Sequence, residues 1–168
     1  QHAGGKPPRE PILFTKASSS LSGPNDAVIL PPGSEKSDWE VELGVVIGKP
    51  CWQVSEADAL SHVAGYCVVN DLSEREWQME RGGQWVKGKS APGYGPCGPW
   101  LVTADEFASG YDDLHVTTRV NGEVRQDSTV ADMIYRPLET LRTLVGFQRM
   151  DAGDLLLTGT PGGTALKA

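Results

Sequence analysis

Short apolar runs, each bounded by Gly, Pro, Asn or Asp, follow one another along most of the chain. Runs of this length that are rich in β-branched and aromatic residues are typical of β-strands. They predict strands at 11–14, 27–30, 39–48, 62–70, 98–102, 114–120 and 154–159. Asn121-Gly122 follows the sixth of these runs and indicates a type I′ turn that leads into a partner strand beginning with EVRQ.

Helical periodicity is less frequent than strand pattern. One amphipathic helix is predicted at 137–147, where four apolar side chains fall on one face: Leu138, Leu141, Leu144 and Val145. Ser55 and Ser73 are each followed by an acid three residues later, which is typical of a capped helix start, whereas 103–106 predicts a turn. The pattern favours a mainly β fold with short helices, a sandwich or rolled barrel more than a doubly wound sheet.

Length, charge and cysteine spacing narrow the class of protein. A chain of 168 residues with 39% hydrophobic residues can form one domain, so we expect a single domain over 1–168. The formal net charge of −7 argues against nucleic acid or an anionic membrane as partner. No apolar run reaches the roughly 20 residues of a membrane helix, and residues 1–11 lack signal-peptide features, so a cytoplasmic location is expected. The three cysteines show no metal or redox spacing and are interpreted as buried, reduced thiols.

Two glutamates stand at the head of the strand predicted at 39–48. Side chains alternate along a strand, so Glu40 and Glu42 share one face while Leu43 and its alternate neighbours form the core face. A solvated polar face is the simpler explanation of such a pair. Asp71, which ends the predicted strand at 62–70, supplies a third acid. Three carboxylates from two adjacent strands would make a cluster of hard ligands suited to Mg²⁺ or Mn²⁺.

Six motifs occur in a fixed order over nearly the whole chain: DWEVELGVVIGK, AGYCVVNDLSEREWQ, GQWVKGKS, GPWLVT, VNGEVRQDS and GDLLLTGTPGG. In this order they resemble the fumarylacetoacetate hydrolase family. The resemblance implies a mixed β-sandwich roll and a homodimer. It also implies that Glu40, Glu42 and Asp71 hold a divalent metal, Mg²⁺ or Mn²⁺.

The same resemblance implies roles for other polar residues. Lys89 matches a lysine placed beside the metal to hold a substrate oxyanion or carboxylate, whereas Lys87 is expected at the surface. Substrate contacts are implied for four further residues: Arg75, Gln78, Thr160 and Lys16. For Arg75 and Gln78 the alternative is a solvent-facing helix, and for Lys16 it is a surface charge at a strand end.

Both ends of the chain depart from the family pattern. Many members carry, on a mobile segment near the start, a histidine followed three residues later by a glutamate, a pair that activates the attacking water. His2 stands in that place but is followed by Ala3, Gly4 and Gly5, so the pair is incomplete. We expect residues 1–10 to form a mobile lid that brings His2 to the site, and further C-terminal strands to follow the GTPGG turn.

The implied activity is cleavage of a C–C bond in an acylpyruvate-like or related diketo acid through a metal-bound enolate. An isomerase or decarboxylase of a 2-oxo acid is the alternative, because family members share the enolate and differ in the reaction. A metal-stabilised binding domain without catalysis is a lesser alternative, suggested by the incomplete pair at His2.

Overall fold

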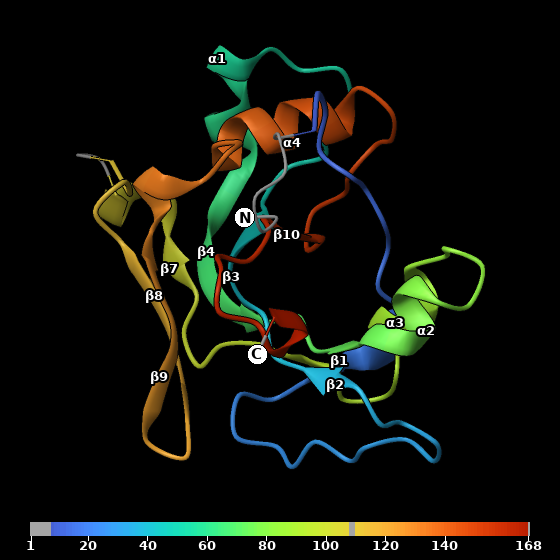
Figure 1. Ribbon diagram of the computed structural model, residues 1–168. Coiled ribbons are helices and arrows are strands. Elements are labelled where there is room, and N and C mark those ends of the chain that lie inside the picture. The colour runs from blue at the N-terminus through green and yellow to red at the C-terminus, as the bar shows by residue number, and fades with distance from the viewer. Residues whose placement is uncertain (1–7, 108–109, 168) are drawn as a thin grey trace.

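A four-stranded antiparallel sheet forms the centre of the computed structural model, which describes residues 8–107 and 110–167 (Figure 1). The strand order is β10 (Leu155–Leu157), β3 (Val41–Ile47), β4 (Val63–Asn70) and β7 (Val102–Thr103). The register of β3 and β4 pairs Val41 with Asn70 and Ile47 with Val63. The start of β3 therefore lies beside the end of β4, which brings the two sequence segments richest in acidic candidates together.

The hydrophobic core lies on one face of this sheet. Leu43, Val45 and Ile47 of β3 pack in one cluster with the buried side of α4 (Pro137–Val145), the amphipathic helix that the sequence predicts. In Figure 1, α4 and α1 (Glu56–Ala59) lie together at one end of the sheet. Ser55 accepts a hydrogen bond from the backbone N–H of Asp58 and so caps α1, as predicted.

A long hairpin extends from the sheet on the side of β7 (Figure 1). Its strands are β8 (His115–Val120) and β9 (Glu123–Thr129), paired antiparallel. Asn121 and Gly122 have φ angles of 52° and 83°, which is the left-handed geometry of the predicted type I′ turn.

Two small ladders complete the described strands. β1 (Leu21–Ser22) pairs parallel with β6 (Gly95–Pro96), and β2 (Ser37–Asp38) pairs antiparallel with β5 (Ser73–Glu74). Two short helices follow β5, α2 (Arg75–Met79) and α3 (Val86–Lys89). The described chain is thus mainly β with short helices, as the sequence predicts.

Three predicted strands differ from the structure. Residues 11–14 and 27–30 form no strand, and 98–102 contributes only Val102 to β7. Prolines explain the differences, because a proline cannot donate to a strand ladder and each of these runs starts with one, contains one or leads into one. Ile29, Leu30 and Trp100 are correspondingly exposed.

The helix predicted to be capped by Ser73 is capped one residue later, by Glu74, and begins at Arg75. Ser73 lies in β5 and its hydroxyl donates to the carbonyl of Asp71 (3.0 Å). Glu74 takes the capping position instead, because its carboxylate accepts from the backbone N–H of Trp77 (2.8 Å). Helix α3 was not predicted, whereas the turn predicted at 103–106 is a 3₁₀ turn at Ala104–Phe107.

The cysteines are free thiols, with Cys51 and Cys67 buried and Cys97 half-buried. Cys67 and Cys97 are neighbours, with 3.6 Å between their Sγ atoms. In the described part of the chain, no helix has both the length and the apolar character needed to cross a membrane.

Candidate metal centre and active site

Three carboxylates converge where β3 begins and β4 ends. The backbone N–H of Asp71 donates to the carbonyl of Glu40 (2.8 Å), and the N–H of Glu40 donates to Oδ1 of Asn70 (3.0 Å). Glu40, Glu42 and Asp71 each offer an oxygen within 4.8 Å of the others. Their exposed fractions of 8%, 3% and 0% exclude the solvated polar face that the sequence alone allows.

Two lysines neutralise part of this cluster. Lys89, at the end of α3, places Nζ 2.6 Å from Oε2 of Glu40 and 2.7 Å from Oδ2 of Asp71. Lys16 places Nζ 2.6 Å from Oδ1 of Asp71 and also donates to the backbone carbonyls of Leu72 and Lys89. Asp71 is therefore held by two ammonium groups.

Arg75, the first residue of α2, holds the other oxygen of Glu40. Its Nη1 lies 2.7 Å from Oε1 of Glu40 and 2.9 Å from Oε1 of Gln78. Its Nε and Nη2 lie 2.8 Å and 2.7 Å from Oδ2 of Asp38. The guanidinium is buried with these partners, so it fixes the orientation of the Glu40 carboxylate whatever else it contacts.

Glu42 differs from the other two acids because it forms no ion pair with any described residue. The backbone N–H of Gly159 donates to its Oε2 (2.6 Å). Burial raises the pKa of Glu42 well above its usual range, and the charges of Asp71 and Glu40 raise it further against the opposing effect of Lys89. A bound cation would relieve this repulsion, because it would compensate the charge that the lysines leave unpaired.

The two lysines differ in their proton affinity. Burial lowers the pKa of Lys16, and its attraction to Asp71 does not fully offset this. Burial also acts to lower the pKa of Lys89, but its two carboxylate partners, Glu40 and Asp71, outweigh it and the pKa is raised. Lys89 therefore stays an ammonium ion beside the cluster.

The turn after β10 holds the start of β3 through side chains. The hydroxyl of Thr158 donates to the carbonyl of Leu43 (2.7 Å), and the hydroxyl of Thr160 donates to that of Val41 (2.8 Å). The amide of Gln126 donates to Thr160 Oγ1 (2.8 Å) and accepts from the N–H of Val41 (3.0 Å). In this structure the Thr160 hydroxyl thus donates its hydrogen bond to the protein backbone.

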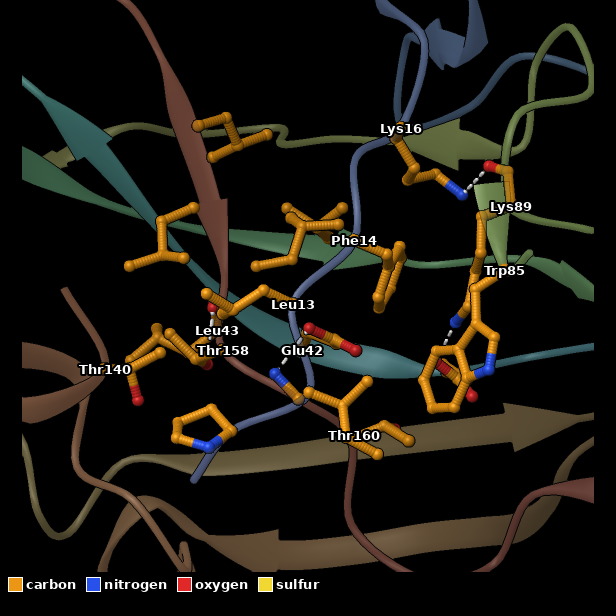
Figure 2. A pocket seen from close by; sticks show the side chains of 18 of the residues that line it. Leu13, Phe14, Lys16, Glu42, Leu43, Trp85, Lys89, Thr140, Thr158 and Thr160 are labelled. Carbon is orange, nitrogen blue, oxygen red and sulfur yellow. Dashed lines mark hydrogen bonds and ion pairs between the residues drawn. The ribbon is translucent and has the colours of Figure 1, made fainter. Parts of the chain in front are cut away.

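A cavity of about 840 Å³ opens onto the carboxylates. Figure 2 shows Lys16, Lys89 and Trp85 on one side of it, and Thr140 and Thr158 on the other. Phe14 packs against Trp85 with ring centroids 5.4 Å apart, and Nζ of Lys89 lies 4.9 Å from the centroid of Phe14. An aromatic wall therefore borders the charged end of the cavity.

The structure brings together all the predicted site residues that it describes. The cavity lining includes these predicted residues: Lys16, Glu40, Glu42, Arg75, Gln78, Lys89 and Thr160. Asp71 lies just behind, in contact with Lys16 and Lys89. Lys87 is exposed, as expected. The predicted base His2 lies outside the described residues, as does most of the predicted lid at 1–10.

The residues of the site that were not singled out from the sequence include Asp38 and Gln126. Asp38 is buried and binds Arg75 together with the backbone N–H groups of Ala165 and Leu166. Gln126 is buried beside Val41 on a strand whose other side chains are mostly exposed. Asp38 directly precedes the strand predicted at 39–48, which is a weak signal, and Gln126 carried no signal because a lone glutamine in a hairpin is usually solvated.

The chain is similar in sequence to curated proteins from Burkholderia species. It is 50% identical over 164 residues to a protein of Burkholderia multivorans that carries the provisional name hydrolase, a match that spans 98% of this chain and 58% of that protein. The chain thus covers less than two thirds of the length of the curated relatives that it matches.

Solved structures agree with the described fold. A fumarylacetoacetate hydrolase from Exiguobacterium antarcticum is 37% identical, with a TM-score of 0.89 over 94% of this chain and 56% of that one. A 2-hydroxyhepta-2,4-diene-1,7-dioate isomerase from Mycobacterium marinum is 36% identical, with a TM-score of 0.88 over 94% of this chain and 61% of that one. The family described as fumarylacetoacetate (FAA) hydrolase C-terminal matches residues 1–168, so the chain belongs to the fumarylacetoacetate hydrolase family.

Proposed function

We propose that the protein is a divalent-cation-dependent hydrolase that cleaves a C–C bond in an acylpyruvate-like or related diketo acid. The observation that carries this proposal is the buried cluster of Glu40, Glu42 and Asp71 with Lys89 directly beside it. Membership of an enzyme family whose relatives bear hydrolase and isomerase names supports it.

The carboxylate cluster fits a hard cation. All three residues offer oxygen donors, which Mg²⁺ and Mn²⁺ prefer over softer ligands. Burial raises the pKa of Glu42, and the negative charges of Asp71 and Glu40 raise it further. A divalent ion would balance that negative charge. Glu40, Glu42 and Asp71 would hold the ion, and a divalent ion there would supply a Lewis acid that polarises the oxygens of a chelating substrate.

Lys89 has the position and charge to stabilise the negative charge that develops on a substrate oxygen. It remains protonated because its pKa is raised, and it is buried, so its field is weakly screened. Arg75 keeps Glu40 in place through an ion pair of 2.7 Å. These two cations hold the acids in a fixed arrangement, so little reorganisation is needed when charge develops.

A 2-oxo or diketo acid suits the cavity chemically. Its vicinal oxygens and carboxylate would face the charged end, which holds Lys16, Arg75 and Lys89. Its acyl part would lie toward the apolar lining, of which Phe14 and Trp85 form one wall and keep water from the reacting bond.

Isomerisation or decarboxylation of a 2-oxo acid on the same residues is the second candidate. The Mycobacterium marinum isomerase, 36% identical to this chain, favours it. These reactions need the cation and an acid/base group but no attacking water. Analysis of the products therefore separates the candidates, because hydrolysis releases two carbon fragments and isomerisation releases none.

The test is turnover of a panel of 2-oxo and diketo acids by the purified protein, with added Mg²⁺ or Mn²⁺ and with chelator. We expect cation-dependent cleavage of a diketo acid and no turnover by Glu42→Gln. Shifted double bonds or CO₂ without cleavage would establish the second candidate. Binding of cation and analogue with no turnover of any member would indicate a non-catalytic binding domain.

A further inference from the structure

Val41, the first residue of β3, lies between Glu40 and Glu42. Val41 is buried, and its side chain lies on the opposite face of the strand from those of Glu40 and Glu42. The backbone torsion angles of Val41 set the direction of the Glu40 side chain relative to that of Glu42. The geometry of the cluster thus depends on what holds the backbone N–H and C=O of Val41.

Pairing with β10 does not hold the backbone N–H and C=O of Val41. The peptide groups of odd-numbered residues in β3 face β10, as the hydrogen bonds from Ile47 N–H to Asp154 (2.9 Å) and from Gly153 N–H to Ile47 (2.8 Å) show. The pairing with β10 ends where Leu157 meets Gly44, before Val41 is reached. The N–H and C=O of Val41 therefore extend past the end of the ladder.

Gln126 supplies the missing partner. Its Oε1 accepts from the N–H of Val41 (3.0 Å) and from the hydroxyl of Thr118 (2.9 Å). Its Nε2 donates to Thr160 Oγ1 (2.8 Å) and to the carbonyl of Pro161 (3.0 Å). Both lone pairs of Oε1 and both protons of Nε2 are thus used by the protein, and Gln126 is only 1% exposed.

The same glutamine reaches the carboxylates by a second route. Thr160 donates to the carbonyl of Val41 (2.8 Å), so Gln126 holds both backbone polar groups of Val41, the N–H directly and the C=O through Thr160. The turn that carries Thr160 also carries Gly159, whose N–H binds Oε2 of Glu42 (2.6 Å). In the described part of the chain, Gln126 is not among the residues that line the cavity.

We propose that Gln126 is a positioning residue for the cation site, which fixes the spacing of Glu40 and Glu42 by holding the backbone N–H and C=O of Val41 and the turn at Gly159 and Thr160. It acts from β9, so the β8–β9 hairpin belongs to the functional site although its strands lie largely outside it. The inference rests on the proposed cation site but not on which reaction the enzyme catalyses.

The test is cation affinity, measured by titration calorimetry with Mn²⁺ on the intact protein. Gln126→Met keeps the length of the side chain and removes all four hydrogen bonds. We expect it to weaken Mn²⁺ binding by about 10-fold or more, the usual cost of losing a residue that orients metal ligands. Hydrogen exchange at the Val41 amide should accelerate in the same variant, because its acceptor is gone.

Matched variants separate positioning from stability. Val145→Ala creates a cavity at a fully buried core residue of α4 that does not line the cavity of the site, so it should lower the melting temperature yet leave Mn²⁺ affinity within about twofold. Gln126→Glu, kept neutral by burial, retains an acceptor for Val41 and a donor for Pro161, so it should restore affinity toward wild type. Gln126→Asn replaces Gln126→Met if the latter does not fold, because it withdraws the amide by one methylene.

Wild-type affinity in Gln126→Met, or an equal loss in Val145→Ala, would overturn the inference. Failure of the wild-type protein to bind Mn²⁺ would instead overturn the proposed cation site, so the two failures are distinguishable.

Discussion

The two ends of β3 are built in different ways. At the far end, Val45 and Ile47 are fully buried in the core cluster and the backbone continues a regular ladder with β10. At the near end, Thr158 and Thr160 replace that ladder with side-chain hydroxyls, and Glu40 and Glu42 lie among buried charges.

This difference separates two sources of order. Burial of apolar area holds the far end, and that contribution depends on area and volume more than on the identity of single atoms. Specific hydrogen bonds and ion pairs hold the near end, where loss of one partner leaves a buried polar group unsatisfied. We therefore expect the far end to tolerate conservative substitution and the near end not to.

Glu42→Gln should produce the largest effect. It removes one of three carboxylates while leaving the core face of β3 untouched, so cation binding and turnover should be lost and the fold retained. Calorimetry with Mn²⁺ and circular dichroism check the two parts. Glu123→Gln, at an exposed position of β9, is the control and should bind Mn²⁺ normally. Retained affinity in Glu42→Gln would remove this residue from the site.

Lys89→Ala should follow in size. Removal of a buried ammonium that stabilises developing negative charge costs about 10²-fold in kcat, by analogy with loss of one oxyanion donor. Cation affinity should not fall, because Glu40 and Asp71 lose a competing positive charge. Lys87→Ala is the matched control on the same short helix, and its side chain is exposed. Equal losses in the two variants would show that Lys89 has no special role.

The sequence predicts the far end of β3 more completely than the near end. Alternation along 39–48 was enough to place the core face of β3, because side-chain direction in a strand follows from its period. It was not enough to show that the glutamates are buried, because burial of that face depends on Lys16, Arg75 and Lys89, which come from distant segments.

Two of the errors have causes that lie outside the local sequence. Residues 11–14 have the composition of a strand, but Phe14 packs on Trp85 at the cavity wall and the segment finds no ladder partner among the described residues. Ser73 has the pattern of a helix cap, but pairing of β5 with β2 keeps it extended, and Glu74 takes its place. Tertiary contacts decided both cases against the local pattern.

The pH dependence of stability should differ between the two ends. The pKa of Glu42 is raised in the folded chain, so its contribution to stability is fully present below the ordinary glutamate pKa and is lost as pH rises through the raised value. Cation-free protein should therefore lose stability with rising pH in that window, as measured by urea unfolding. Glu42→Gln should lack this loss and added Mg²⁺ should reverse it, whereas a slope that survives in Glu42→Gln must come from another group.

Ile47→Val should have the smallest effect and tests the far end directly. It removes one methylene from a side chain that is 1% exposed, so the free energy of unfolding should fall by about 0.5–1.5 kcal/mol. Ile47 lies five residues from Glu42, or about 17 Å along the strand, and shares none of its partners. Mn²⁺ affinity should therefore stay within about twofold of wild type, because distant sites contribute independently.

Val68→Ala is the control for Ile47→Val. Val68 lies on neighbouring β4 with half of its surface exposed, so its truncation should change the free energy of unfolding by less than about 0.5 kcal/mol. If Ile47→Val lowers the free energy of unfolding and leaves Mn²⁺ affinity unchanged, the two ends of β3 are energetically independent. A weakened affinity for Mn²⁺ in Ile47→Val would mean that strain passes along β3 from the core to the carboxylates. The two ends would then form one cooperative unit, and the near end would depend on core volume as well as on its own hydrogen bonds.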